Sequence, residues 1–113
     1  MAGDPPVIFG DGEQRRDFVH VGDVADATVL AAQKDVAGEV FNVGTGIATS
    51  VNQIAEMLCR KLNPGIRPVH APEQMGELRF SVPDISRARR VLGYDPKGRL
   101  EERIDEVIGW HRR

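Results

Sequence analysis

The chain has 113 residues, a formal net charge of −2 and 41% apolar residues, which is the usage of an ordinary globular protein. A chain of this length is expected to form one domain with one modest core. Its balanced charge provides no field for a polyanion, and no stretch approaches the ~20 apolar residues of a membrane span, so neither nucleic acid nor membrane is an expected partner. The polar N-terminus, Met1–Pro6, has no apolar signal core, and with the lone Cys59 it predicts a soluble, cytoplasmic protein.

The first half of the chain alternates short apolar runs with turn signals. Three of these runs are predicted strands: Val7–Phe9, Phe18–Val21 and Val40–Val43. Between the second and third runs, a helix is expected to begin at Val24 with Asp23 as its N-cap. The spacing of small apolar residues in this helix indicates a flat face that packs closely on a sheet.

The second half is mostly helical. Ser50 followed by Gln53 is a capping-box pattern, and it opens a helix whose apolar residues keep helical spacing to Leu62. After this helix we expect a strand at Arg67–His70 and a loop at Ala71–Glu77. Two more helices are predicted, Ile85–Leu92 (between the caps Asp84 and Gly93) and Leu100–Trp110. Strands that alternate with helices predict an α/β fold with a small, partly parallel sheet and flanking helices. Such a thin sheet has too few helices to cover both faces, which indicates part of a larger fold.

Two Gly-x-Gly turns invite comparison with a dinucleotide-binding turn. The position of the third glycine is occupied by Arg15 after Gly10-Asp11-Gly12 and by Thr49 after Gly44-Thr45-Gly46. Because the third glycine permits close packing of helix on strand, both are interpreted as tight turns between elements. The three histidines have no metal-ligand spacing, so no cofactor-binding, metal-binding or catalytic residue is assigned.

Two adjacent arginines, Arg15 and Arg16, stand at the entry to an apolar run. A guanidinium at a strand end can fork onto a phosphate or carboxylate. The alternative is a surface salt bridge to Asp17 or Glu13, and the residues themselves leave both interpretations open.

Several segments together resemble one known family, from about Pro6 to Trp110. They are, in family order and spacing, Ile8-Phe9-Gly-Asp-Gly-Glu-Gln, Arg16-Asp-Phe-Val-His-Val-Gly-Asp-Val-Ala, Gly38-Glu-Val-Phe-Asn-Val-Gly-Thr-Gly, Gly76-Glu, Asp84-Ile-Ser-Arg-Ala and Leu92-Gly-Tyr-Asp-Pro. This set resembles the NAD-dependent epimerases and dehydratases of the extended short-chain dehydrogenase/reductase family, with the UDP-glucose 4-epimerases as the nearest group. The resemblance covers roughly the last third of a member, so it implies that residues 1–113 are a single C-terminal substrate-binding domain without the N-terminal Rossmann domain.

The resemblance also implies a set of substrate-binding residues. Val7, Ile8 and Phe9 match the strand whose backbone meets the nucleotide base, and Arg16 matches the arginine that holds the diphosphate. A second diphosphate arginine is expected two residues before Gly76-Glu77, where this chain has Gln74. Arg79 is the residue expected to replace it.

The catalytic part of the family is not found in this sequence. The resemblance implies a Tyr-x-x-x-Lys pair, but the only tyrosine, Tyr94, has Gly98 four residues later. The expected function is therefore binding of a nucleotide sugar, as the non-catalytic part of an NAD-dependent enzyme. NAD is implied for the full-length enzyme and is not expected to bind this chain alone. The alternatives are a free-standing nucleotide-diphosphate-binding module and a truncated remnant that binds nothing.

Two protein partners are expected. One is the N-terminal Rossmann domain, because the resemblance implies that the runs at Phe18–Val21 and Val40–Val43 extend its sheet. The other is a second copy of the chain, because strands without that sheet leave unpaired edges and exposed apolar area.

Overall fold

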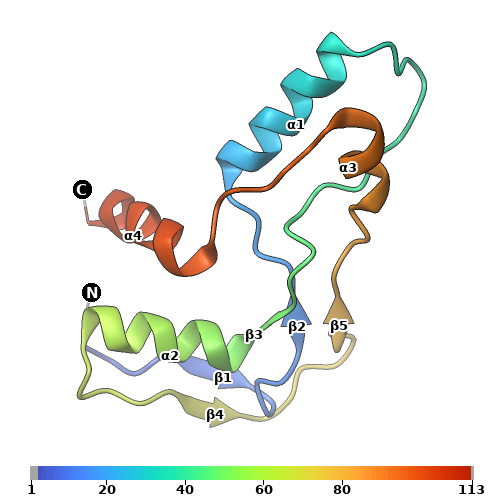
Figure 1. Ribbon diagram of the computed structural model, residues 1–113. Helices are drawn as coiled ribbons and strands as arrows, with labels where there is room; N and C mark the ends of the chain where they lie inside the picture. The colour runs from blue at the N-terminus through green and yellow to red at the C-terminus, as the bar shows by residue number, and fades with distance from the viewer. Residues whose placement is uncertain (1–2, 113) are drawn as a thin grey trace. The chain divides into compact units, whose positions relative to one another are not determined.

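The computed structural model describes residues 3–112 and divides the chain into two compact units. Unit 1 combines Met1–Arg16 with Ala48–Ser81, and unit 2 combines Asp17–Ile47 with Val82–Arg113. Each unit is thus assembled from two stretches that are far apart in sequence, as Figure 1 shows along the ribbon. That residues 1–113 act as one C-terminal domain stays a prediction.

Unit 1 contains a two-stranded parallel sheet. Strand β1 (Val7–Phe9) pairs with β4 (Val69–Ala71), and Val7 lies opposite Val69 in the register. The side chain of Ile8 is only 3% exposed, whereas its two neighbours in β1 face outward. The prediction of a strand at Val7–Phe9 is therefore confirmed, and β4 begins two residues later than the predicted Arg67–His70 run.

A second, three-stranded sheet in unit 1 is built on the two arginines. Strand β2 (Arg15–Arg16) lies in the centre, antiparallel to β3 (Thr49–Ser50) and parallel to β5 (Phe80–Ser81). The Arg15 amide donates to the Arg79 carbonyl oxygen at 2.8 Å. This pairing brings the end of the loop 72–79 next to Arg15 and Arg16.

Helix α2 (Val51–Leu62) follows β3 directly and begins with the predicted capping box. The Ser50 hydroxyl accepts a hydrogen bond from the Gln53 amide at 3.1 Å, and the Gln53 side chain accepts one from the Ser50 amide at 2.7 Å. The predicted helix and its bounds are therefore confirmed. The sequence could predict them because Ser50 and Gln53, which form the capping box, are only three residues apart.

Unit 2 contains α1 (Val21–Gln33), α3 (Ser86–Leu92) and α4 (Leu100–His111), and α1 packs against α3. Its buried core consists of Ala27, Ile85, Ala88, Leu92 and Tyr94. Helix α3 ends at Gly93, which has the left-handed conformation (φ 72°) expected of a C-cap glycine. The predictions of the last two helices are confirmed to within one residue at each end.

The strands predicted at Phe18–Val21 and Val40–Val43 are wrong for this structure. Residues 17–20 and 39–43 form no strand, and α1 already begins at Val21. A strand needs a neighbour to receive its backbone hydrogen bonds, and no strand within residues 3–112 pairs with either segment. The two apolar runs therefore have no strand ladder in the described part of the chain.

The predicted N-cap of α1 is also wrong. The helix begins earlier because the Nδ1 atom of His20 accepts a hydrogen bond from the Gly22 amide at 3.0 Å. Asp23 is instead a buried carboxylate in the first turn, and it accepts from the amides of Lys97 and Gly98 at 3.0 and 2.9 Å. Asp23 thus holds the segment between α3 and α4 against α1.

Small mixed sheets and four helices within the described residues confirm the α/β class. None of these helices combines the length and the apolar character that crossing a membrane requires.

Candidate functional site

Strand β2 positions Arg16 at its last residue. One guanidinium nitrogen, Nη1, donates to the Arg15 carbonyl oxygen at 2.9 Å, and Nη2 lies 3.8 Å from Glu77 Oε1. The sequence left open a surface salt bridge to Asp17 or Glu13, and the structure gives an ion pair with Glu77 instead. The Arg16 side chain is 28% exposed, so an anion can reach it from solvent.

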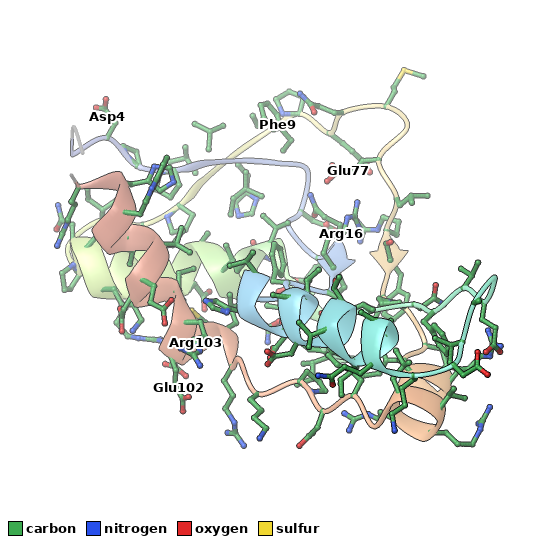
Figure 2. The ribbon with its side chains drawn as sticks, turned by 90° about the horizontal axis from the view of Figure 1, so that it is seen from above. Asp4, Phe9, Arg16, Glu77, Glu102 and Arg103 are labelled. Carbon is green, nitrogen blue, oxygen red and sulfur yellow. The ribbon has the colours of Figure 1, made fainter. Side chains whose placement is uncertain are left out.

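Glu77 and Gln14 complete the surroundings of Arg16. The Gln14 side chain donates from Nε2 to Glu77 Oε1 at 3.2 Å and to the Phe9 carbonyl oxygen at 3.3 Å. We call Phe9, Gln14, Arg16, Glu77 and Arg79 the Arg16 cluster. Figure 2 shows the labelled Phe9, Arg16 and Glu77 side chains in the same region of unit 1.

Arg79 is held by Asp11 through a bidentate pair. Its Nη1 and Nη2 atoms donate to the two carboxylate oxygens of Asp11 at 2.8 and 3.0 Å. The hydrogen bonds from Arg79, followed by that from the Glu13 amide, lower the pKa of Asp11 to about 2. The same pair raises the pKa of Arg79, so both groups are fully charged at neutral pH.

The cluster borders a shallow hollow, lined by Phe9, Gln14, Glu73, Glu77 and Arg79, in which these side chains leave no room for a water molecule. Sites that enclose a small molecule commonly have volumes of roughly 300–1,000 Å³. The hollow is therefore not an enclosed ligand site, and an anion would reach the cluster only at its surface.

Of the predicted substrate-binding residues, the structure brings three together: Phe9, Arg16 and Arg79. Ile8 lies beside them in the chain, but its side chain belongs to the core, so only its backbone is available to a ligand. Val7 is exposed at the start of β1. Gln74 lies exposed in the loop 72–79 and is not among the residues that line the hollow.

Three cluster residues or partners were not predicted as site residues: Asp11, Gln14 and Glu77. All three belong to segments that carry the family resemblance, so the sequence contained a reason to consider them. The sequence did not reveal their contacts, because Gln14, for example, donates to Glu77, which is 63 residues away in the chain.

The Gly44-Thr45-Gly46 turn in unit 2 is organised around Asp17. The Asp17 carboxylate accepts from the Thr45 amide at 2.8 Å, from the Thr45 hydroxyl at 2.6 Å and from the Gly46 amide at 2.8 Å. A Cβ atom on Gly44 would lie 2.5 Å from Asp17 Oδ2, so glycine is needed there for this close approach. The donors that a dinucleotide turn would offer to a phosphate are thus engaged by a carboxylate, and the turn does not fit that cofactor.

Tyr94 is a core residue of unit 2. It is 2% exposed, and its hydroxyl donates to the Gly44 carbonyl oxygen at 2.6 Å. Burial, followed by the nearby charges of Asp23 and Asp17, raises the pKa of Tyr94. A proton-transfer tyrosine needs access to substrate and a lowered pKa, so Tyr94 has the opposite properties.

The histidines and acidic residues do not gather into a metal site. His20 Nε2 lies 3.1 Å from Glu106 Oε2, and His70 Nδ1 lies 2.8 Å from the Gly10 carbonyl oxygen. In the part of the chain that the structure describes, no group of three or more His, Cys, Asp or Glu side chains is arranged to hold a metal ion.

Comparison with known proteins gives a consistent result along the chain. Residues 1–44 match the model of the NAD dependent epimerase/dehydratase family. The UDP-glucose 4-epimerase of Mycolicibacterium smegmatis is 39% identical over 112 residues, which are 99% of this chain and 36% of that protein.

Solved structures show the same relationship. UDP-glucose 4-epimerase from Thermotoga maritima with UDP-glucose matches with a TM-score of 0.89 and 41% identity, over 97% of this chain and 35% of that chain. UDP-glucuronic acid 4-epimerase from Bacillus cereus, in complex with UDP-glucuronic acid and NAD, matches with a TM-score of 0.79 and 33% identity, over 88% of this chain and 33% of that chain. The chain spans about a third of the length of the relatives it matches. By sequence and by fold, the chain matches about a third of the length of proteins of the NAD dependent epimerase/dehydratase family.

Proposed function

We propose that this chain binds a nucleotide sugar of the UDP-sugar type, as the substrate-binding part of an NAD-dependent epimerase or dehydratase. The observation that carries this proposal is the Arg16 cluster, in which the partly exposed Arg16 guanidinium lies beside Glu77, and Arg79 lines a shallow hollow next to the end of β1. The relatives from T. maritima and B. cereus, solved with UDP-glucose and UDP-glucuronic acid, support the class of ligand.

Each predicted residue has a role in this proposal. The edge of β1 that β4 leaves open at Val7, Ile8 and Phe9 offers backbone groups to the base. Arg16 holds the diphosphate. Arg79 supplies the second cation in place of Gln74, and it exchanges part of its pair with Asp11 for a phosphate oxygen when the ligand binds.

Catalysis is assigned to residues outside this chain. The proposed chemistry of the complete enzyme is NAD-assisted oxidation at a sugar carbon, followed by re-reduction or elimination. Tyr94 is buried and the Gly44 turn is closed by Asp17, so we assign no step of hydride or proton transfer to this chain. The proposed partner is an N-terminal Rossmann domain that carries the dinucleotide turn and the Tyr-x-x-x-Lys pair, in the cytoplasm.

In the absence of that partner, we propose that two copies of the chain associate. The segments 17–20 and 39–43 pair with no strand among the described residues, and Val40 is 79% exposed. Unpaired backbone edges beside exposed apolar side chains favour pairing with a second copy.

Measured binding of UDP or UDP-glucose would distinguish the proposed function from the alternative, a remnant that binds nothing. We expect Arg16→Ala to weaken binding of UDP or UDP-glucose by about ten- to a hundredfold, because a charge-assisted hydrogen bond contributes about 1.5–3 kcal/mol. Arg15→Ala is the matched control, since Arg15 is the neighbouring residue of the same strand. Equal losses in both variants, measured by calorimetric titration, would mean a diffuse charge effect and would overturn the assignment of Arg16.

A further inference from the structure

Gln14 is a buried amide in the middle of the Arg16 cluster, and only 5% of its surface is exposed. Its Nε2 group donates to the Phe9 carbonyl oxygen and to Glu77 Oε1. Its Oε1 atom is buried and has no hydrogen-bond partner among residues 3–112. The opposite orientation of the amide would place Oε1 against two acceptors, so the contacts determine which end is which.

The fold itself does not require an amide at this position. A buried acceptor without a partner destabilises the folded state, whereas an apolar side chain of the same shape would remove that cost. The two hydrogen bonds that Gln14 donates are long, at 3.2 and 3.3 Å, and compensate only in part. Buried polar groups of this kind call for a functional explanation.

The explanation lies in what the amide does to Glu77. Glu77 Oε1 is 3.8 Å from Arg16 Nη2, which is longer than the roughly 2.7–2.9 Å of a direct charge-assisted hydrogen bond. The same oxygen is engaged by Gln14, whose amide is in turn anchored to the end of β1 at Phe9. Gln14 therefore holds the carboxylate short of full contact with the arginine.

We propose that Gln14 is a positioning residue that keeps Arg16 available to an anion, by tethering Glu77 to the end of β1. Without the tether, Glu77 closes onto Arg16 and competes with the diphosphate for its guanidinium donors. The consequence for ligand affinity rests on the proposed function, whereas the tether itself does not.

The test compares Gln14→Met with Gln33→Met, an exposed glutamine at the end of α1. In the complete 113-residue chain, we expect Gln14→Met to weaken UDP binding about tenfold, with a thermal midpoint equal to or above that of the wild type. Gln33→Met should leave both unchanged. In a Glu77→Gln background, Gln14→Met should weaken binding no further, because the competing carboxylate is already gone.

A measurement without ligand tests the tether directly. The Nε–Hε signal of Arg16 in an NMR spectrum should shift in Gln14→Met as the carboxylate closes, and should not shift in Gln33→Met. An unchanged Arg16 signal, or unchanged UDP affinity in a chain that binds UDP, would overturn the proposal. A lower thermal midpoint with a matching loss of binding would make Gln14 merely structural. If the wild type binds no UDP, the proposed function fails, and the Arg16 signal still decides whether the tether exists.

Discussion

Arg79 and Asp11 meet through two nearly equal hydrogen bonds, and this geometry has a measurable consequence for acid titration. The pKa of Asp11 falls to about 2 from an ordinary value of 3.8. Because the folded-state pKa is the lower one, any stabilisation from the pair is complete above pH 3.8 and is lost as the pH falls toward 2.

We therefore expect the carboxyl carbon of Asp11, followed by NMR, to titrate with a midpoint near 2, and with a higher midpoint in Arg79→Ala that stays below 3.8 because the Glu13 amide still donates to the carboxylate. Arg15→Ala is the control, and it should leave the midpoint low. A wild-type midpoint of 3.8 would show that the bidentate pair does not persist in solution.

For single residues, the sequence indicates which side chains are candidates for a site, but it does not indicate which residues they contact. Arg16 and Phe9 could be proposed as site residues from the family resemblance, because each stands inside a motif of fixed spacing, and their binding roles stay predictions. The ion pair of Arg16 with Glu77 could not, because the pairing of β2 with β5 brings together residues that are remote in the chain. Asp11 was likewise missed, since its partner Arg79 is 68 residues away.

Helices and strands also differ in how well the sequence predicts them. The capping box before α2 and the glycine after α3 are local signals, and the helices they delimit agree with the prediction. Strands need partners, so an apolar run such as Phe18–Val21 predicts only the tendency to pair. In contrast, β2 consists of two arginines and no apolar run predicts it, and it is a strand because it pairs with β3 and β5 in the three-stranded sheet.

The contact of Tyr94 with Gly44 joins two segments of unit 2 around its core. The tyrosine hydroxyl donates to the glycine carbonyl at 2.6 Å, and both residues are buried. Tyr94→Phe leaves that carbonyl oxygen without this donor, so we expect a loss of about 1–3 kcal/mol in the free energy of unfolding.

Urea denaturation followed by circular dichroism measures this loss. A stability equal to that of the wild type would contradict the contact. A change in UDP affinity without a change in stability would contradict the role of Tyr94 as a core residue of unit 2.

For the whole molecule, the exposed apolar residues and unpaired segments predict self-association. Val40, Phe80 and Trp110 are each more than half exposed, at 79%, 61% and 62%. These side chains provide apolar surface on which a second copy can pack, so we expect light scattering at ~10 µM to give the mass of a dimer. A monomer mass together with sharp, dispersed amide signals would contradict this and would favour the free-standing module.

We propose that this chain binds the nucleotide sugar and does not bind the dinucleotide. The decisive measurement is calorimetric titration of one preparation with UDP-glucose and, separately, with NAD. We expect saturable binding of UDP-glucose through the Arg16 cluster and no specific binding of NAD, because the donors of the Gly44 turn are engaged by Asp17. Saturable micromolar binding of NAD, or no binding of UDP-glucose, would contradict it.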